Sequence, residues 1–358
     1  MRQHKGCALV YGQMIHHLDH LATLASILQI PLIVTEEEIE KAAKRHYPSL
    51  VTYFYDPLMA PKEIVKKYDF VFSSLPIDLF NEIFFVSMQM LQKKLLSIWV
   101  PHGQSDKGSF SPFYEALYKE SIALVYGERM IDQFKSAKLL DKISHIIEVG
   151  NYRLDYYQQH KSFYDKLISN TLLKSLDPKK RTLLYAPTWQ DREDSCSLFH
   201  LGPQLINNIS ANFNLIIKLH PNTLLSDLPA IESLKGLAEK KENIHFLASF
   251  SPIYPLLGLT DLYLGDMSSI GYDFLAFDRP LILINHHMRE KQPLSEAALT
   301  LTPSDFDHIE DFFYSDQPQL QKNRQNLYKK TFSSKHLSLL KEEIFDLIDY
   351  LIEETLFI

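Results

Sequence analysis

The chain has 358 residues, of which 46% are hydrophobic and 23% are charged, a composition typical of globular proteins. A single hydrophobic core rarely extends over such a length, so two domains are expected. The 37 Lys and Arg residues against 44 Asp and Glu residues give a net charge of −7, which argues against a nucleic-acid partner.

A cytoplasmic location is expected from the same data. No apolar run reaches the roughly 18 residues of a membrane-spanning helix, and the first residues do not lead into a signal-peptide core. Cys7 and Cys196 are too few and too far apart for a disulfide framework or a zinc site, which agrees with a reducing compartment.

The first part of the chain alternates between strand and helix patterns. Residues 6–11 and 31–34 are apolar runs, and residues 16–29 between them have helical spacing. Further strands are expected at 51–55, 70–73, 95–100, 123–126 and 146–149, with helices at 81–94 and 129–140. The first turn has Gly12 alone instead of G-x-G-x-x-G, so nicotinamide-cofactor chemistry is not expected.

A second alternating series follows. Strands are expected at 182–185, 215–219, 244–247, 262–264 and 281–284, with helices that include 202–208 and 231–241. Two such series predict an α/β fold with two doubly wound, Rossmann-like domains facing a cleft. We expect domains at 1–160 and 161–332 and a terminal helix at 333–358, whose apolar face must pack on another element.

His102 directly follows one predicted strand end, with Gly103 and Lys107 close behind it. A histidine at the carboxyl edge of a parallel sheet can take a proton from a hydroxyl near neutral pH, and Lys107 adds a cation. A structural histidine bound to a loop carbonyl explains the residue type equally well.

The second domain places polar groups after three predicted strands. Lys218 and His220 can contact a diphosphate or stabilise a leaving phosphate, or they simply mark a solvated strand end. Thr188 can bind a phosphate oxygen and Trp189 can flank a small ligand, although a tryptophan packed between domains is an equally good interpretation.

The third of these polar groups lies between residues 265 and 274. Ser268 and Ser269 precede a helix, where hydroxyls cap backbone N–H groups and can bind a diphosphate. Asp266 can bond a ribose or glycerol hydroxyl or act only as a turn residue, and Asp273 lies about one turn into the helix, where it can hold the loop.

A histidine cluster in the first strand-to-helix connection allows two interpretations. His16 and His20 have the spacing of a metal-binding pair, but His17 and Asp19 complete no recognisable ligand set. We therefore favour a polar edge facing an acceptor and expect no metal.

Five blocks in this order resemble the CDP-glycerol glycerophosphotransferase family of teichoic-acid-type polymerases and primases. They are VPHGQSDKG at 100–108, VGNYRLD at 149–155, LLYAPTWQD at 183–191, IIKLHPN at 216–222 and TDLYLGDMSSIGYDFLAFDRPLILIN at 260–285. The APTW and D-x-S-S-I motifs are the most specific. The chain departs from the family pattern at Pro101, Gln190 and Met267, where the family has tryptophan, arginine and, more often, tyrosine.

The resemblance implies a glycosyltransferase-B-like fold whose terminal helix crosses back onto the first domain. It implies a transferase that moves glycerol phosphate from a CDP-activated donor to an acceptor hydroxyl and releases CMP, with His102 as general base and His220 as the second catalytic group. The alternatives are a glycosyltransferase that uses a nucleotide sugar, a nucleotide-sugar 2-epimerase of the same fold, and a non-catalytic nucleotide-sugar-binding module.

The expected partners follow from this reaction. They are a CDP-polyol or another nucleotide-activated donor, and a glycan, polyol-phosphate or lipid-linked acceptor through which the protein contacts the membrane surface. No cofactor is expected. The terminal helix is too acidic for a membrane-binding role.

Overall fold

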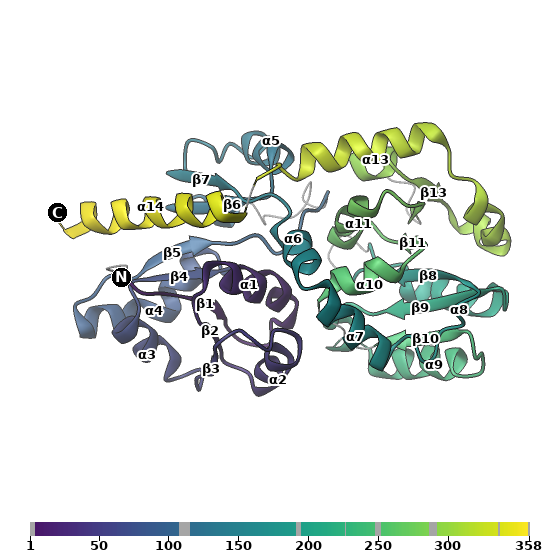
Figure 1. The fold of residues 1–358 in the computed structure, drawn as a ribbon, viewed down its shortest axis with the longest axis horizontal. Helices are drawn as coiled ribbons and strands as arrows, with labels where there is room; N and C mark the ends of the chain where they lie inside the picture. Colours follow the sequence, from purple (N-terminus) through teal and green to yellow (C-terminus); the bar gives the residue numbers. More distant parts are fainter. Residues whose placement is uncertain are drawn as a thin grey trace. The chain divides into compact units, whose positions relative to one another are not determined.

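The computed structural model describes residues 4–106, 115–190, 195–225, 227–247, 252–285, 292–335 and 337–356. They form two α/β units, each with its own parallel sheet (Figure 1). The first unit contains the described parts of 1–102, 112–156 and 330–358, and the second unit contains those of 103–111 and 157–329. The short segment that begins at Gly103 therefore belongs to the second unit, which the sequence did not indicate.

The first unit is built on a seven-stranded parallel sheet in the order β3-β2-β1-β4-β5-β6-β7. The strands are β1 (Gly6–Val10), β2 (Leu32–Val34), β3 (Thr52–Phe54), β4 (Phe70–Ser73), β5 (Leu96–Trp99), β6 (Ile122–Val125) and β7 (His145–Glu148). Leu9 pairs with Ser73, and Ser73 pairs with Trp99, so β1, β4 and β5 end at the same level. The strand order reverses between β1 and β4, and ligands of doubly wound sheets bind beside such a reversal.

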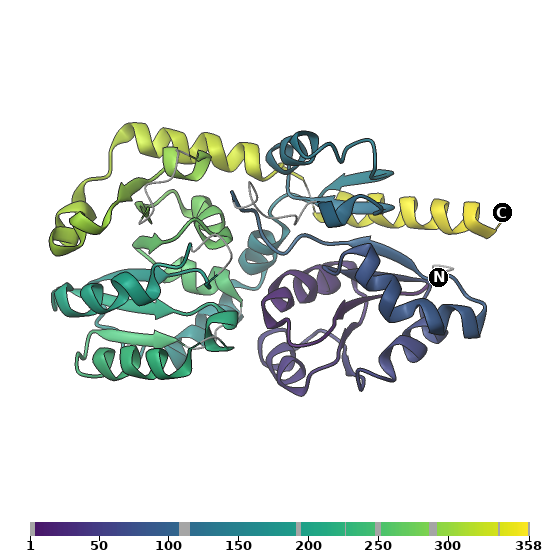
Figure 2. The ribbon, with the colours of Figure 1, turned by 180° about the vertical axis from the view of Figure 1, so that it is seen from behind.

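Helices connect these strands. They are α1 (Ile15–Leu28), α2 (Glu37–His46), α3 (Ala60–Lys67), α4 (Ile77–Leu91), the short η1 (Glu115–Leu117) and α5 (Glu128–Ser136). After β7 comes α6 (Tyr152–Gln159), within which the first unit ends at Tyr156. Figure 2 shows the face of the molecule opposite to that of Figure 1. The core between the sheet and α3 and α4 includes Val71, Ile64 and Phe84, each with no exposed surface.

The last helix, α14 (Leu337–Leu356), packs on the first unit, where it contacts α1 (Figure 1). Phe345 meets the ring of Phe70 edge-on at 6.0 Å between ring centroids. The segment before α14 passes close to Gly150, where a side chain would collide with the Ser333 carbonyl. Glycine is also favoured there because its φ is +60°.

The second unit repeats the same topology with six parallel strands in the order β10-β9-β8-β11-β12-β13. They are β8 (Arg181–Ala186), β9 (Phe213–Lys218), β10 (Ile244–Leu247), β11 (Leu262–Gly265), β12 (Leu281–Ile284) and β13 (Leu299–Leu301). The reversal lies between β8 and β11. The other strands were all predicted from their apolar runs. The exception is β13, which is only three residues long and has no recognisable strand pattern in the sequence.

The connecting helices of this unit include both α-helices and short 3-10 helices. They are α7 (Lys161–Thr171), α8 (Leu198–Asn208), η2 (Pro221–Leu225), α9 (Leu228–Ala238), α10 (Ile253–Leu259), α11 (Ser269–Phe274), η3 (Leu275–Phe277), α12 (Pro293–Glu296), η4 (Pro303–Tyr314) and α13 (Pro318–Thr331). The predicted class of two Rossmann-like α/β domains is confirmed. No helix in the described ranges is long and apolar enough to cross a membrane.

Adjacent leucines on α14 test its packing. Leu340 is fully buried and Leu339 is 61% exposed, so replacement of each by alanine should change the stability by very different amounts. We expect Leu340→Ala to lower the free energy of unfolding by about 2–5 kcal/mol and Leu339→Ala to change it by less than about 0.5 kcal/mol. Urea unfolding followed by circular dichroism measures both. Equal effects would show that α14 does not pack on the unit in this register.

Candidate active site

In the second unit, the predicted polar groups follow β9, β8 and β11, which are neighbours in the sheet. Tyr185 pairs with Ile217 on one side and with Leu264 on the other, so the three strands end side by side. The polar groups after these strands therefore share one edge of the sheet, beside the reversal of strand order. They are Lys218 and His220, Thr188 and Trp189, and Asp266 to Ser269. This edge is where doubly wound folds bind ligands.

Asp266, in the loop after β11, makes hydrogen bonds to the segment that follows β8. Its side chain is 1% exposed, and Oδ2 accepts hydrogen bonds from the backbone N–H groups of Thr188 at 2.8 Å and Ser197 at 3.1 Å. Charge-assisted bonds to a buried carboxylate hold a loop firmly. The structure thus gives Asp266 a positioning role for the loop that carries Thr188, which is itself buried.

His220 and Trp189 lie next to each other, with ring centroids 6.2 Å apart. The backbone N–H of Asn222 donates to His220 Nδ1 at 3.1 Å, so in the neutral ring the proton is on Nε2. His220 is thereby arranged as a hydrogen-bond donor. Lys218, the last residue of β9, is 8% exposed, and its Nζ donates to the Leu219 carbonyl at 3.4 Å.

The two serines stand at the beginning of α11. Ser268 is its N-cap residue, with Oγ 3.4 Å from the Tyr263 hydroxyl, and Ser269 is its first residue. Gly103 lies against this turn, because a Cβ atom on it would be 2.5 Å from Ser269 Cβ, and its φ of +137° also favours glycine. Gly103 thus serves the turn of the second unit, although the sequence placed it with the first domain.

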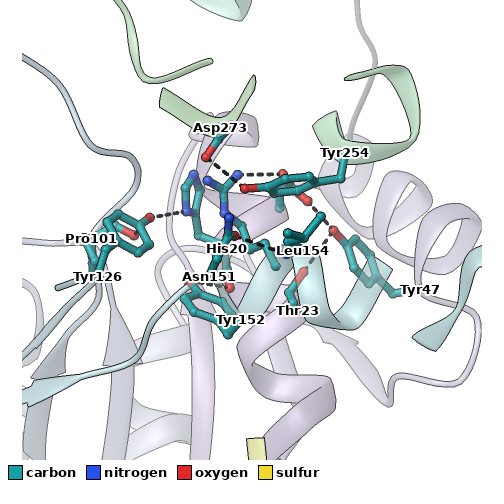
Figure 3. Close-up of polar contacts among 12 residues, drawn as sticks. His20, Thr23, Tyr47, Pro101, Tyr126, Asn151, Tyr152, Leu154, Tyr254 and Asp273 are labelled. Atoms are coloured by element: carbon teal, nitrogen blue, oxygen red, sulfur yellow. Dashed lines mark hydrogen bonds and ion pairs between the residues drawn. The ribbon is translucent and has the colours of Figure 1, made fainter. Parts of the chain in front are cut away.

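Two further carboxylates fix this region. Asp273, which is buried in α11, accepts a hydrogen bond from the Tyr254 hydroxyl at 3.2 Å (Figure 3). Asp106 accepts from the Tyr272 hydroxyl at 2.6 Å, and the sequence gave no indication of this role. Lys107, the predicted cation next to it, lies outside the described residues.

In the first unit, His102 follows β5 and lies among the histidines of α1. The ring centroid of His102 is 4.7 Å from that of His17 and 5.8 Å from that of His16. His16 and His17 are 4.4 Å apart. The structure therefore brings together two sequence features, the strand-end histidine and the histidine cluster, that are 85 residues apart (102 − 17).

A hydrogen-bonded chain supports the backbone just before His102 (Figure 3). The Tyr126 hydroxyl donates to the Pro101 carbonyl at 3.1 Å and lies 2.9 Å from His20 Nδ1. Because the single hydroxyl proton serves Pro101, His20 Nδ1–H donates to the tyrosine oxygen. Sequence reasoning missed Tyr126, which looks like an ordinary core residue after β6.

Arg153, which lies in the VGNYRLD block, holds α1 through an ion pair with Asp19. Its Nη1 donates to Asp19 Oδ2 at 3.1 Å, and Tyr47 donates to Asp19 Oδ1 at 2.8 Å (Figure 3). Arg153 and Asp19 are 4% and 8% exposed, so each compensates the buried charge of the other. The sequence assigned no role to Arg153.

Burial keeps these imidazoles neutral. Desolvation, together with the nearby His16, lowers the pKa of His102 to about 3. Desolvation also lowers the pKa of His17 well below its usual range, with further contributions from His102 and His16. For His20, desolvation and then Arg153 lower the pKa in the same direction. Neutral imidazoles at pH 7 can accept protons, as a general base must.

A metal centre is not found in the described part of the chain. No group of three or more His, Cys, Asp or Glu residues there is arranged to hold an ion. The rings of His16, His17 and His102 pack against one another, and His20 is engaged by Tyr126.

Two Rossmann-like units, each with polar groups at its strand ends, define a fold of glycosyltransferase-B type. The sequence model of CDP-Glycerol:Poly(glycerophosphate) glycerophosphotransferase matches residues 114–292, which is half of the chain. The chain belongs to this family.

The relatives agree with this assignment. A teichoic acid glycerol-phosphate primase of Bacillus subtilis strain 168 is 24% identical over 263 residues, which cover 68% of this chain and 65% of the relative. The match thus spans less than two thirds of that protein's length. A primase of Bacillus spizizenii strain W23 is 29% identical over 133 residues, which cover 36% of this chain and 32% of the relative.

Solved structures share the fold. The wall teichoic acid polymerase TagF has a TM-score of 0.65 at 14% identity, with 98% of this chain and 90% of that chain covered. A putative UDP-N-acetylglucosamine 2-epimerase of Listeria monocytogenes has the same TM-score, 0.65, at 13% identity, with 99% and 98% covered. At such low identity these likenesses establish the fold alone.

The pH dependence of stability tests the neutral histidines. Because the pKa of His102 is lower in the folded chain than the usual 6.5, protonation favours unfolding. The folded protein therefore has its full stability above pH 6.5, where the His102 ring is neutral in both the folded and the unfolded state. It loses this stability as the pH falls toward about 3. We expect His102→Asn to flatten this decline in urea unfolding, whereas His145→Asn, at the start of β7, should not. Identical profiles for wild type and His102→Asn would contradict this.

Proposed function

We propose that the protein transfers glycerol phosphate, or a closely related polyol phosphate, from a CDP-activated donor to an acceptor hydroxyl and releases CMP. Family membership supports this reaction, and the single structural observation that carries it is the donor-rich strand edge of the second unit. There Ser268, Ser269 and His220 provide hydroxyl and imidazole groups suited to a diphosphate, while Asp266 is engaged with the backbone.

In the proposed mechanism, His102 takes the proton of the acceptor hydroxyl. The acceptor oxygen then forms a bond to the β-phosphorus of the donor, and the bond from that phosphorus to the oxygen bridging to CMP breaks. His220, with its proton on Nε2, stabilises the charge on the departing CMP. Positioning and electrostatics account for most of the rate in such phosphoryl transfers.

The low pKa of His102 has a consequence for this step. With a pKa lowered to about 3 by burial, the His102 ring is neutral at pH 7 but is a weak base. A diphosphate or phosphate close to the ring stabilises the imidazolium and raises its pKa toward the range in which proton transfer is efficient. The substrates themselves therefore activate the base in this mechanism.

The nucleotide-sugar reactions remain the second candidates. The 2-epimerase of Listeria monocytogenes shares the fold over 99% of this chain, so the architecture alone also suits a UDP-sugar. The match to the family over residues 114–292, which include the APTW and D-x-S-S-I motifs, favours CDP-glycerol.

Contact with a membrane surface through the acceptor is part of the proposal. The outer face of α4 exposes Phe85, Val86 and Met90, which are 57%, 62% and 72% exposed, and Lys94 follows the helix. Exposed apolar groups beside a cation suit a surface of anionic lipid. The proposed location is the cytoplasm, because Cys7 and Cys196 are free thiols.

Two histidine variants test whether the first unit supplies the general base and the second unit binds the donor. We expect His102→Ala to leave CDP-glycerol affinity nearly unchanged and to reduce turnover about 10²- to 10⁴-fold, as is usual for a general base. His220→Ala should weaken both donor binding and turnover, because His220 contacts the bound donor. Calorimetric titration and CMP release measure the two quantities.

The matched control for both variants is His145→Ala, which should change neither quantity. An unchanged rate in His102→Ala with a productive acceptor would make this residue structural. If His102→Ala weakens donor binding as much as His220→Ala does, the assignment of donor and acceptor to separate units is wrong.

A further inference from the structure

The first unit contains a cavity of about 550 Å³ at the amino ends of β1 and β4. Gly6, which begins β1, and Phe70, which begins β4, both line it. Leu28, the last residue of α1, also lines the cavity, whereas His16 and His17 are in the first turn of that helix. At about 1.5 Å per residue, α1 places roughly 15–20 Å between the histidines and the cavity. The cavity is therefore separate from the candidate active site.

We propose that this cavity binds a small organic anion with an apolar body, of which a medium-chain carboxylate is the simplest example. The apolar body lies among the aromatic rings of the wall, and the charged group lies beside Lys5 and Lys341. The volume is within the usual range of small-molecule sites, about 300–1,000 Å³. This second site takes no part in the proposed transfer reaction.

Apolar side chains form much of the cavity wall. Tyr68, Phe70 and Phe345 are 8%, 1% and 4% exposed, and all three line the cavity. Gly6 leaves room for the Phe70 ring, because a Cβ atom on Gly6 would collide with that ring. Each CH₂ group that such a wall removes from water strengthens binding by about fourfold. The wall therefore favours a ligand with an apolar body several carbons long.

The charged groups of the wall are positive. Lys5 and Lys341 line the cavity, and no Asp or Glu is among its described lining residues. The Lys5 ammonium makes no ion pair within the described part of the chain, and Lys341 Nζ donates to the neutral Gln29 side chain at 2.7 Å. The neighbouring Asp69 accepts a hydrogen bond from the Lys5 backbone N–H at 2.8 Å and pairs with Lys93 at 2.9 Å. A cavity lined by one sign of charge attracts a ligand of the opposite sign.

A buried nitrogen atom is an independent indication of a ligand. His4 lines the cavity, and its Nε2 atom is buried without a hydrogen-bond partner among the described residues. Buried polar atoms are normally hydrogen-bonded, so an unpaired one in a cavity wall points to a group that binds there. A carboxylate can accept hydrogen bonds from an imidazole N–H and from ammonium groups at once, because its two oxygens offer about four acceptor positions.

Calorimetric titration of the full chain with octanoate tests the site. Octan-1-ol keeps the apolar body without the charge, and butanoate keeps the charge with a shorter body. We expect octanoate to bind at least about tenfold more tightly than either compound. Equal affinity for octan-1-ol would show that the positive groups do not contribute, and equal affinity for butanoate would show that the apolar wall does not. Either result would overturn the proposal.

Removal of the two cations tests where octanoate binds. Lys5→Gln combined with Lys341→Gln should weaken octanoate binding by about tenfold or more and leave the affinity for octan-1-ol unchanged. The matched control combines Lys62→Gln with Lys66→Gln, which removes two exposed charges from α3 of the same unit and should behave as wild type.

The result is decisive even if the double variant does not fold, as judged by circular dichroism. Lys5→Gln alone then takes its place, because the Lys5 side chain is exposed, and it should weaken octanoate binding by about threefold or more. Octanoate affinity that is equal in wild type and in the folded cavity variant would overturn the proposal.

Two further titrations distinguish this cavity from other places on the protein. Phe85→Ser changes the exposed apolar face of α4 and should leave octanoate affinity unchanged, whereas a loss of binding would move the site to α4 and overturn the proposal. Saturating CMP should also leave it unchanged, and competition would contradict a separate site. If these tests succeed while CDP-glycerol is not consumed, the transfer reaction is wrong and the cavity site stands.

Discussion

Both units depend on one constraint, the all-parallel strand order that runs outward in both directions from a central pair. Strands buried on both faces must be apolar, so the polar groups of β8, β9 and β11 can appear only where those strands end. The reversal between β1 and β4, and between β8 and β11, leaves a place at this edge that no connecting helix covers. The first unit fills this edge with imidazoles and the second with hydroxyls and an imidazole donor.

Burial then determines what these groups can do. Asp266 is at the edge of the second sheet, and its Oδ2 atom accepts hydrogen bonds from the Thr188 and Ser197 N–H groups, so this carboxylate holds the loop in place. In the first unit, burial keeps His102 neutral and lowers its pKa to about 3. The same desolvation makes the pKa of the imidazole sensitive to a nearby anion, so in the proposed mechanism the charge of the substrate would determine the strength of the base.

The sequence predicted the parts of the molecule that depend on local pattern. Apolar runs located all strands except the three-residue β13, and the polar clusters after them located His102, His220 and Ser268 at strand ends. It did not predict contacts between distant segments. The docking of Gly103 against Ser269, the Tyr126 support of Pro101 and the Arg153 pair with Asp19 join residues far apart in the chain, and no periodicity or spacing encodes them.

Phosphorus NMR of a mixture of protein, CDP-glycerol and a phosphate-bearing polyol acceptor tests the central claim most directly. Transfer of glycerol phosphate predicts that the diphosphate resonances of the donor are replaced by equal amounts of the CMP monoester and a new phosphodiester. Without acceptor, the donor should persist. Formation of CMP with free glycerol phosphate would indicate hydrolysis instead, and an unchanged donor alongside consumption of a UDP-sugar would contradict the assignment of a glycerophosphotransferase.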